Sequence, residues 1–514
     1  MNAASALLGP AASGRQAGRI ALACSGEEVS YAGLAEQVAR SAGALAALGV
    51  RPGDRVLLLL RDTLEAAAAW LGAVHAGAVA VGLNTKLSAD DFRHVAADSG
   101  ARLVLVEGLY AAARPDLAAE TARAGRLAVA GAPLPEGAYD WRAELARAAA
   151  LAPHPARAED PAFWLYSSGT TGKPKGIVHT HRSILASGEA LRALGIAAGD
   201  RVFTTSKFFF AYGLEHGLLG PLALGATGVV LADWAEPAAA IEAVAHHRPA
   251  AMFSVPSFYR RLLAEPDERL APLRAIRHFV AAGERLPEPV IAEWRARVGG
   301  EILSLYGTSE AYCACLMMPP GISAAENGRG RTGRPLARTE ARLADASGAE
   351  PPQGEPGVLW LRHPALAQGY VNRPEETRAQ FRDGWFCTRD VFVRDEAGYY
   401  VHQGRSDELV KIAGQWVRPS EVEEVVVVEP AIAEAACVPV PDADGFERLA
   451  LFVVARADAP SALAAAERAC AERLPRHKRP KWFRALVELP RTASGKVQRY
   501  RLREMLAREA LARG

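Results

Sequence analysis

The sequence has no excess of charge of either sign. Its 514 residues include 60 Lys and Arg against 58 Asp and Glu, which leaves a net charge of +2. No block of like charges stands out, and this argues against a nucleic-acid-binding arm and against a polybasic membrane anchor. Charge therefore identifies no partner, and we expect neither nucleic acid nor membrane insertion.

Cysteine is also scarce. The six cysteines form no CxxC pair and have no histidines at the spacing of a zinc site: Cys24, Cys313, Cys315, Cys387, Cys437 and Cys470. Cys313 and Cys315 are close enough to suggest a metal or redox pair, but no further ligands accompany them. We predict reduced, mostly buried thiols that serve ordinary packing.

A leader and a long apolar run are missing as well. Residues 1–20 lack a basic segment followed by an apolar one, so no signal peptide is evident. The longest apolar stretch, residues 66–83, contains His75 and three glycines. This stretch is typical of a buried helix followed by a strand rather than of a membrane span. We expect a cytoplasmic protein.

Short β-branched or Leu-rich runs alternate with Ala-rich stretches over the first four hundred residues. Strands are predicted at 55–60, 78–83, 102–107, 163–166, 176–179, 228–231 and 251–255, and helices at 63–75 and 181–194. His179 and His181 are interpreted as structural residues at the start of the second helix. The alternation predicts one large α/β body.

The texture changes from about residue 384 to short strands with turn residues. A helix at 419–428, strands at 435–440 and 449–455, and a helix at 461–474 then predict a small α+β unit. The length also favours more than one domain. We predict domains at 1–406 and 407–514, and clefts between domains are common ligand sites.

The segment SSGTTGKPKG, residues 167–176, lies between two predicted strands. Its small and hydroxylated residues would let backbone N–H groups and hydroxyls close around phosphate oxygens, and Lys173 and Lys175 add positive charge. The segment does not fit the Walker pattern, which needs a Lys-Ser/Thr pair that opens a helix. The alternative is a solvent-exposed turn, but ten residues of this composition favour phosphate binding.

The segment resembles the phosphate loop of the adenylate-forming superfamily, which includes acyl-CoA synthetases, luciferases and peptide-synthetase adenylation domains. Six further matches follow in the family's order: YGTSE at 306–310, GRP at 333–335, GY at 369–370, TRD at 388–390, GRSDELVK at 404–411 and PRTASGK at 490–496. The TRD segment departs from a Thr-Gly-Asp motif because Arg389 replaces the glycine. The resemblance implies a large α/β N-terminal domain and a small mobile α+β C-terminal domain.

The resemblance also implies ATP, Mg²⁺ and CoA as cofactors and assigns roles to single residues. Glu310 would bind Mg²⁺ through a hard oxygen, and Thr308 would donate a hydrogen bond to the α-phosphate or the acyl carboxylate. The remaining ATP- or AMP-binding residues would be Ser167, Ser168, Gly169, Thr170, Thr171, Gly172, Lys175, Gly283, Glu284, Arg285, Leu305, Tyr306, Gly307, Asp390 and Arg405. Tyr306 would stack on adenine. Asp390 and Arg405 would hold the ribose, although a strand-end salt bridge is the alternative.

In the family, the lysine that matches Lys496 reaches into the main site during adenylation and acts through charge and position. Relatives then rotate about the residue that matches Asp407. This rotation would bring Lys411, Gly414, Gln415 and Trp416 towards the CoA thiol tunnel. Bacterial acetyltransferases modify the matching lysine in relatives, so acetylation of Lys496 is expected to remove its charge. A homodimer is a further expectation.

The run KFFFAYGL, residues 207–214, resembles the corresponding run in benzoate-CoA ligases and related aryl-CoA ligases. The resemblance places Phe210 at the gate between the acyl pocket and the CoA tunnel. Ala211, Tyr212 and Gly213 would form the pocket floor, and Ala281 and Tyr312 further parts of its wall. Aromatic walls suit a flat ring. Phe208 and Phe209 are better interpreted as core residues.

Two features limit the choice of acid. Residues 204–214 contain no Asp or Glu, so the ammonium group of a free amino acid would have no partner. The benzoate group carries a Met-Leu-His run after the glutamate, whereas this chain has Ala311-Tyr312-Cys313. A substituted benzoate, a heteroaryl acid and a compact aliphatic acid therefore all remain open.

The predicted function is activation of a small, aromatic carboxylic acid with ATP to an acyl-AMP, followed by thioester formation with CoA. The chain ends eighteen residues after Lys496, which favours a free-standing ligase that uses soluble CoA. The alternatives are an aliphatic acyl-CoA synthetase, an enzyme that loads a carrier protein, and a catalytically reduced nucleotide-binding protein. The presence of Lys496, Glu310 and the phosphate loop argues against the last.

Overall fold

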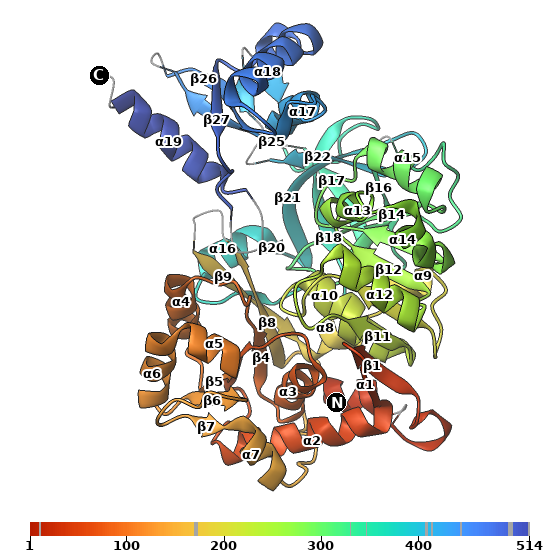
Figure 1. Cartoon of the computed structure of the whole chain (residues 1–514), viewed down its shortest axis with the longest axis vertical. Coiled ribbons are helices and arrows are strands. Elements are labelled where there is room, and N and C mark those ends of the chain that lie inside the picture. The colour runs from red at the N-terminus through yellow and green to blue at the C-terminus, as the bar shows by residue number, and fades with distance from the viewer. Residues whose placement is uncertain are drawn as a thin grey trace. The chain divides into compact units, whose positions relative to one another are not determined.

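The computed structural model describes residues 1–9, 12–168, 173–328, 330–345, 347–406, 410–412, 415–442, 445–491 and 497–511. The chain forms two compact units (Figure 1). The large unit comprises Met1–Arg342, Trp360–Thr388 and Arg394–Val401, and the small unit comprises Leu343–Leu359, Arg389–Val393 and His402–Gly514. Two segments before the expected boundary at Asp407 therefore group with the C-terminal residues.

The first sheet of the large unit has the strand order β19-β9-β8-β4-β3-β5-β6-β7. Its bounds are β3 (Arg55–Leu59), β4 (Val79–Gly82), β5 (Leu103–Glu107), β6 (Leu127–Ala130), β7 (Tyr139–Asp140), β8 (Pro161–Ser168), β9 (Pro174–Thr180) and β19 (Gly369–Tyr370). Strands β3 to β7 and the β4–β8 pair are parallel, while β9 is antiparallel to β8. The predicted strands in this region are thus confirmed.

Helices cover both faces of this sheet (Figure 1). Leu57 and Leu59 pack in one cluster with α4 (Ala89–Ser99), α5 (Gly108–Ala113) and α6 (Pro115–Arg123). Val56 and Leu58 belong to the cluster of α1 (Ala3–Leu8), α2 (Tyr31–Ala47), α3 (Leu64–His75) and α7 (Trp141–Arg147). Successive residues of a strand face opposite sides of the sheet. A parallel sheet that is buried on both faces therefore needs strands made of consecutive apolar residues.

The second sheet includes, in this order, the strands β16-β15-β14-β13-β12-β10-β11-β1-β2 of the large unit, and β16 also pairs with β22. Its bounds are β1 (Ile20–Cys24), β2 (Glu27–Ser30), β10 (Arg201–Thr204), β11 (Thr227–Val230), β12 (Ala251–Ser254), β13 (His278–Ala281), β14 (Ile302–Gly307), β15 (Ala314–Met317) and β16 (Arg331–Pro335). Strands β1, β11, β10, β12, β13 and β14 are parallel. Their carboxyl ends therefore share one edge, and ligands commonly bind at such an edge.

Met252 on β12 belongs to the core cluster that α12 (Pro237–His247), α13 (Pro256–Leu262), α14 (Asp267–Leu270) and α15 (Glu288–Arg297) form with the sheet. Its neighbour Phe253 belongs to the cluster on the other face, against which Tyr212 of α10 (Ala211–Leu214) packs. A π-helical segment, η2 (Glu215–Leu219), and α11 (Gly220–Leu224) continue α10. The predicted aryl-acid segment thus lies on the Phe253 side of the sheet.

The remaining elements of the second half include α16 (Pro374–Gln380) and β20 (Phe381–Arg382) in the large unit. Strands β17 (Glu340–Ala344), β18 (Pro356–Arg362), β21 (Trp385–Arg394) and β22 (Tyr400–Arg405) contribute residues to both units. Within the described part of the chain, no helix has both the length and the apolar character that crossing a bilayer demands.

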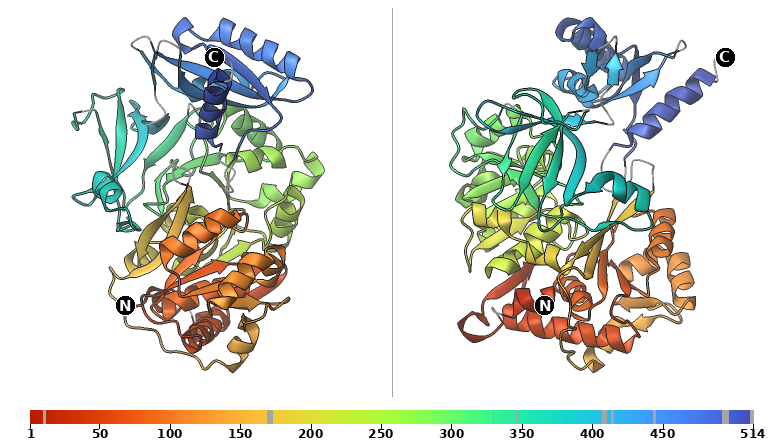
Figure 2. Two further views of the ribbon diagram at one scale, coloured as in Figure 1. Left: turned by 90° about the vertical axis from the view of Figure 1, so that its left-hand side faces the viewer. Right: turned by 180° about the vertical axis from the view of Figure 1, so that it is seen from behind.

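The small unit is built on a sheet of β25 (Ile432–Pro441), β26 (Glu447–Ala455) and β27 (Trp482–Leu486). Helices α17 (Pro419–Val426) and α18 (Ala459–Arg473) share a buried cluster with this sheet, and Figure 2 shows α18 along its face. The hairpin β23 (Val410–Ile412) and β24 (Gln415–Val417) precedes α17, and α19 (Arg499–Leu511) follows the sheet. The predicted α+β character is confirmed.

The single helix expected at 181–194 is wrong. The structure has two short helices, α8 (His181–Leu185) and α9 (Glu189–Ala193). Gly188 separates them with φ of 89°, a left-handed conformation that ends a helix. Its N–H donates a hydrogen bond to the buried Glu215 carboxylate at 2.7 Å, a contact far along the chain that fixes the break.

Candidate functional site

The phosphate-loop segment joins the antiparallel strands β8 and β9, whose register pairs Ser167 with Lys175. The two strands expected on either side of the segment are therefore present. Gly169, Thr170, Thr171 and Gly172 lie outside the described residues, and so does the side chain of Ser168.

Lys175 is the centre of a polar cluster in the large unit. Its Nζ lies 2.9 Å from the Glu376 carboxylate and 3.7 Å from the Glu310 carboxylate. The same ammonium lies 3.8 Å from the centroid of the Tyr370 ring, and the Tyr370 hydroxyl donates a hydrogen bond to Glu310 at 2.8 Å. The fold thus brings the predicted phosphate-binding lysine and the predicted metal-binding carboxylate together.

Two members of this cluster were not among the predicted site residues. Tyr370 belongs to the GY motif, to which the sequence attached no role. Glu376 lies in the first turn of α16, where acidic residues are favoured at any helix start, so its pairing with Lys175 left no distinct signal in the sequence.

The residues after β14 form a tight turn. The Thr308 Oγ1 accepts a hydrogen bond from the Ala311 N–H at 3.1 Å, and its carbonyl accepts one from the Tyr312 N–H at 2.9 Å. Leu305 is buried in the sheet and Tyr306 is half-buried. A Cβ on Gly307 would lie 2.8 Å from the Cys313 carbonyl oxygen, so only glycine fits there without a shift. The turn therefore fixes the backbone positions of Thr308 and Glu310.

The residues after β13 form a second loop at the same carboxyl edge. Ala281 is buried at the strand end, and Gly283 has φ of 87°. The Glu284 carboxylate accepts hydrogen bonds from the Ser257 N–H at 3.2 Å and from its hydroxyl at 3.3 Å. Arg285 is exposed beside it. Glu284 thus anchors this loop to the start of α13.

Of the carboxylates in this region, Glu376 pairs with Lys175 and Glu284 accepts hydrogen bonds from Ser257, and Glu310 is the one expected to bind a divalent metal. Among the described residues, no group of three or more His, Cys, Asp and Glu could hold an ion alone. Mg²⁺ is usually bound by one or two carboxylates together with substrate phosphates and water, so this donor set fits Mg²⁺ delivered with a nucleotide.

The aryl-acid segment begins with a buried lysine that faces a buried carboxyl group. Lys207 Nζ lies 3.8 Å from Asp62, whose carboxylate also accepts the Phe208 N–H at 3.1 Å. Burial raises the pKa of Asp62 to about 7, although the Lys207 charge opposes this shift, and burial lowers the pKa of Lys207. Asp62 was missed from the sequence; the only hint was that a lysine within an apolar run needs an acidic partner.

The aromatic residues of this segment differ in burial, and the expected burial of Phe208 and Phe209 is confirmed. Phe208 and Phe209 are buried, while Phe210 and Ala211 are partly exposed. The Tyr212 hydroxyl donates hydrogen bonds to the Ser254 and Val280 carbonyls at 3.3 and 3.2 Å, at the ends of β12 and β13. The segment is thereby tied to the carboxyl edge of the second sheet.

Tyr312 is buried and has φ of 60°, a conformation that is strained for a bulky side chain. Its hydroxyl lies 3.1 Å from the Ser187 hydroxyl, and its ring meets the Phe163 ring edge-on at 5.1 Å. Burial also raises the pKa of Tyr312 well above its usual value. Tyr312 thus belongs to a buried core cluster together with Phe163, and its place beside the acid stays a prediction.

The two histidines and the pair Cys313 and Cys315, which the sequence assigned to packing, are buried. His179 stacks on Phe163 at 4.7 Å, and burial lowers its pKa to about 4. The His181 Nδ1 accepts the Ala3 N–H at 3.1 Å. Cys313 and Cys315 are buried, and burial raises the pKa of both thiols. These interpretations are confirmed.

In the small unit, the Asp390 carboxylate lies 3.6 Å from Arg405 and 3.6 Å from His402. The ion pair that the sequence offered as an alternative is therefore present. A carboxylate has about four lone pairs, so an ion pair does not prevent it from accepting ribose hydroxyls. Arg389, which replaces the motif's glycine, has φ of 62°.

Most of the other site residues predicted in the C-terminal part, or their side chains, lie outside the described residues. Asp407, Gly414 and Lys496 lie outside the described residues, as do the side chains of Lys411 and Trp416. Gln415 is exposed in β24.

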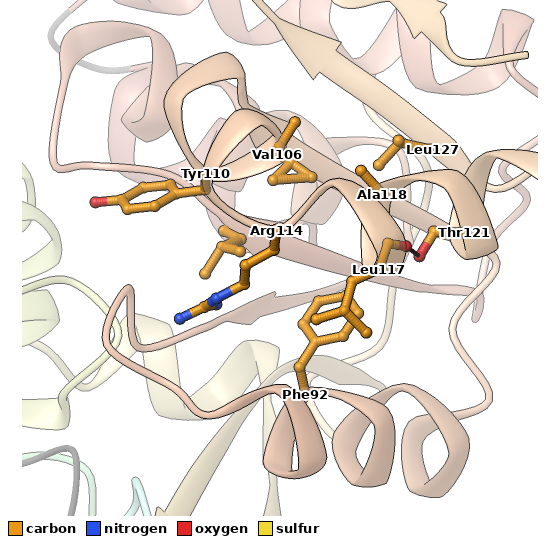
Figure 3. A pocket seen from close by; sticks show the side chains of 10 residues that line it. Phe92, Val106, Tyr110, Arg114, Leu117, Ala118, Thr121 and Leu127 are labelled. Carbon is orange, nitrogen blue, oxygen red and sulfur yellow. Dashed lines mark hydrogen bonds between the residues drawn. The ribbon is translucent and has the colours of Figure 1, made fainter. Parts of the chain in front are cut away.

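A small apolar pocket lies elsewhere in the large unit, between the first sheet and helices α4, α5 and α6 (Figure 3). Figure 3 shows Tyr110 and Arg114 on one side of it and Thr121 on the other. None of the predicted site residues lines it. It is a feature of packing between sheet and helices.

The carboxyl edge with its lysine, carboxylate and glycine loops defines a nucleotide-binding enzyme of the adenylate-forming type. Residues 10–371 match the family model for an AMP-binding enzyme, and residues 421–496 match that for the AMP-binding enzyme C-terminal domain. The chain belongs to the AMP-binding enzyme family. The predicted recognition, fold class and reaction class of an AMP-forming acid–thiol ligase are confirmed, and the CoA ligases of this family use ATP, CoA and Mg²⁺.

The relatives agree along the whole chain. A 3-hydroxybenzoate–CoA ligase of Aromatoleum sp. (strain CIB) is 40% identical over 98% of this chain and 97% of its own. A benzoate–CoA ligase of Thauera aromatica is 37% identical over 92% and 90%. The crystal structure of the anthranilate CoA ligase AuaEII in complex with anthranoyl-AMP superposes with a TM-score of 0.88 at 29% identity, over 99% and 98% of the two chains.

Proposed function

We propose that the protein joins a small aromatic carboxylic acid of the benzoate class to CoA through an acyl-AMP. The observation that carries this proposal is the 40% identity over 98% of the chain to a 3-hydroxybenzoate–CoA ligase. The partly exposed side chains of Phe210 and Ala211 support it, because an aromatic ring and a small methyl group can pack against a flat ring.

The first half-reaction joins a carboxylate oxygen of the acid to the α-phosphorus of ATP, and pyrophosphate leaves. Lys175 and the backbone of residues 169–172 bind phosphate oxygens, and Thr308 orients the α-phosphate or the acid. Glu310 would hold Mg²⁺, which would supply positive charge to the phosphates when bound. Ser167, Ser168, Gly283, Glu284, Arg285, Leu305, Tyr306 and Gly307 complete the adenylate site, with Asp390 and Arg405 at the ribose.

In the second half-reaction the CoA thiolate sulfur attacks the acyl carbon, and AMP leaves. Rotation about Asp407 exchanges Lys496 for Lys411, Gly414, Gln415 and Trp416 between the two half-reactions. Lys496→Ala should therefore lose adenylation far more than thioester formation from supplied acyl-AMP. Equal loss in both steps would contradict this alternation.

Three finer expectations accompany the proposal. ATP and CoA are cytoplasmic metabolites, which supports a cytoplasmic location. A homodimer is tested by light scattering on the purified protein. Acetylation of Lys496 would remove the charge that adenylation uses, and acetylated enzyme of confirmed intact mass that keeps its full adenylation rate would refute it.

The decisive experiment is AMP release with and without CoA over benzoate, 3-hydroxybenzoate, anthranilate, furoate, cinnamate, butyrate and hexanoate. We expect CoA-dependent release with the benzoates and little with the aliphatic acids. Glu310→Gln is the matched variant, because it keeps size and removes the metal-binding charge. Preference for an aliphatic acid would contradict the proposal that the substrate is aromatic. Transfer of the acyl group to a carrier protein but not to CoA would contradict the proposal that CoA is the acceptor.

A further inference from the structure

His216 is a buried imidazole about one helical turn beyond residues 211–213, the proposed pocket floor. It lies in the π-helical segment η2, four residues after Tyr212, and its side chain is about 1% exposed. Its ring stacks on Phe253 with centroids 4.1 Å apart and planes 22° from parallel, and it lies 4.8 Å from the Tyr212 ring. π-helical turns frequently occur at functional sites.

The surroundings of His216 determine its tautomer. Nδ1 lies 2.9 Å from the Tyr212 carbonyl oxygen. A carbonyl oxygen only accepts hydrogen bonds, so Nδ1 carries the hydrogen. Burial lowers the pKa of His216, and the ring is therefore neutral near pH 7. Nε2 must then be a bare acceptor with one lone pair.

Among the described residues, Nε2 has no hydrogen-bond partner, although it is fully buried. The neighbouring polar groups are directed elsewhere. The Glu215 carboxylate accepts the Gly188 N–H. The Tyr212 hydroxyl donates to the Ser254 and Val280 carbonyls. A buried acceptor without a donor is unfavourable, so a ligand that supplies a donor gains affinity.

We propose that the His216 Nε2 accepts a hydrogen bond from a ring substituent of the acid, so that the pocket selects benzoates that carry a hydroxyl or amino group. Benzoate and the methoxybenzoates have no ring O–H or N–H group to donate a hydrogen bond, so they leave Nε2 unpaired. Sites that hydrogen-bond a substrate group discriminate strongly against analogues without it. This inference rests on the proposed function and narrows its substrate class.

The test compares kcat/KM for the three hydroxybenzoates, the three aminobenzoates, benzoate and 3-methoxybenzoate in the unmodified enzyme and two variants. His216→Asn keeps a donor at the position of Nδ1 and removes the acceptor at Nε2. His216→Gln places an amide oxygen near the position of Nε2. His75→Asn is the control, because His75 is a buried histidine whose Nε2 lies 2.9 Å from the Leu151 carbonyl.

We expect the best hydroxy- or aminobenzoate to exceed benzoate by about 10- to 100-fold in the unmodified enzyme. His216→Asn should lower this ratio by the same factor, His216→Gln should restore part of it, and His75→Asn should leave it unchanged. A purely structural role of His216 would lower kcat/KM for all acids equally and keep the ratio, which would overturn the inference.

Failure of the inference is distinguishable from failure of the proposed function. Turnover of benzoates with a ratio that is insensitive to His216→Asn refutes the inference alone. Absence of CoA-dependent AMP release with every aromatic acid refutes the proposed function. As a second readout, the Nε2 nitrogen resonance of His216 should move on addition of the preferred acid with AMP and should stay in place with benzoate and AMP.

Discussion

The Tyr370 hydroxyl donates a hydrogen bond to the Glu310 carboxylate across 2.8 Å. The face of the same ring lies 3.8 Å from the Lys175 ammonium. One side chain therefore orients both the proposed metal ligand and the proposed phosphate ligand. This gives a physical reason for a tyrosine in the GY motif.

Tyr370→Phe keeps the ring under Lys175 and removes only the hydroxyl. Because Glu310 then loses a hydrogen bond that orients its carboxylate, we expect kcat/KM for Mg-ATP to fall by about tenfold, with a smaller change in KM for the acid. Steady-state kinetics with each substrate varied checks this split. Tyr139→Phe, at an exposed tyrosine, is the control, and equal losses for ATP and acid would contradict the assigned role.

Arg389→Gly is expected to stabilise the protein. Arg389 has φ of 62°, where a side chain costs backbone energy and glycine does not. After the entropy that glycine loses on folding, the net gain should be about 0.5–1 kcal/mol. Arg394→Gly, on the same strand without a positive φ, should destabilise by a similar amount. Thermal unfolding measures both, and two destabilised variants would show that Arg389 is not strained.

Several parts of the fold and site follow from local sequence. The strands of the first sheet are apolar runs, and a segment of small and hydroxylated residues marked the loop before Lys175. Phe208 and Phe209 were placed in the core because uncharged aromatics in an apolar run are usually buried. In each case the signal lies within about ten residues of the feature that it predicts.

The missed features depend on contacts between distant parts of the chain. Glu376 pairs with Lys175 across 201 residues, and Asp62 holds the Phe208 N–H across 146. The break in the helix at 181–194 depends on the Glu215 carboxylate, 27 residues beyond Gly188. A single sequence carries no local pattern for such pairs, since the identity of an Asp or Glu residue does not show whether its side chain is buried or exposed.

Asp62 should make stability depend on pH in an unusual direction. Its pKa is raised by burial to about 7 from a usual 3.8, so between these values the folded state binds the proton that the unfolded state has released. The contribution of Asp62 is therefore fully present below about pH 4 and is lost as the pH rises through about 7. Asp62→Asn cannot ionise and removes this dependence.

The difference in the free energy of unfolding, unmodified protein minus Asp62→Asn, should fall from about pH 4 to about pH 7, by at most about 1.4 kcal/mol per pH unit. Chemical denaturation of both proteins across this range isolates the effect, because other titrating groups cancel. A difference that rises with pH would show that the Lys207 charge outweighs burial and keeps Asp62 ionised.

Gly213→Ala should damage the acid site without abolishing the fold. A Cβ at Gly213 would lie 2.2 Å from the Lys207 carbonyl oxygen. That carbonyl accepts the Phe210 N–H at 2.9 Å and so closes the turn that presents Phe210. Because backbone atoms have little room to move, the methyl group must push this turn away from α10.

We therefore expect KM for the acid to rise at least about tenfold in Gly213→Ala, while KM for ATP changes little, and stability to fall by about 1–3 kcal/mol. Gly18→Ala is the matched control, since a Cβ there meets no atom within 4 Å and its φ is not positive. An unchanged KM for the aromatic acid would mean that residues 210–213 do not form the pocket, and the acid would then have to be sought against another part of the carboxyl edge.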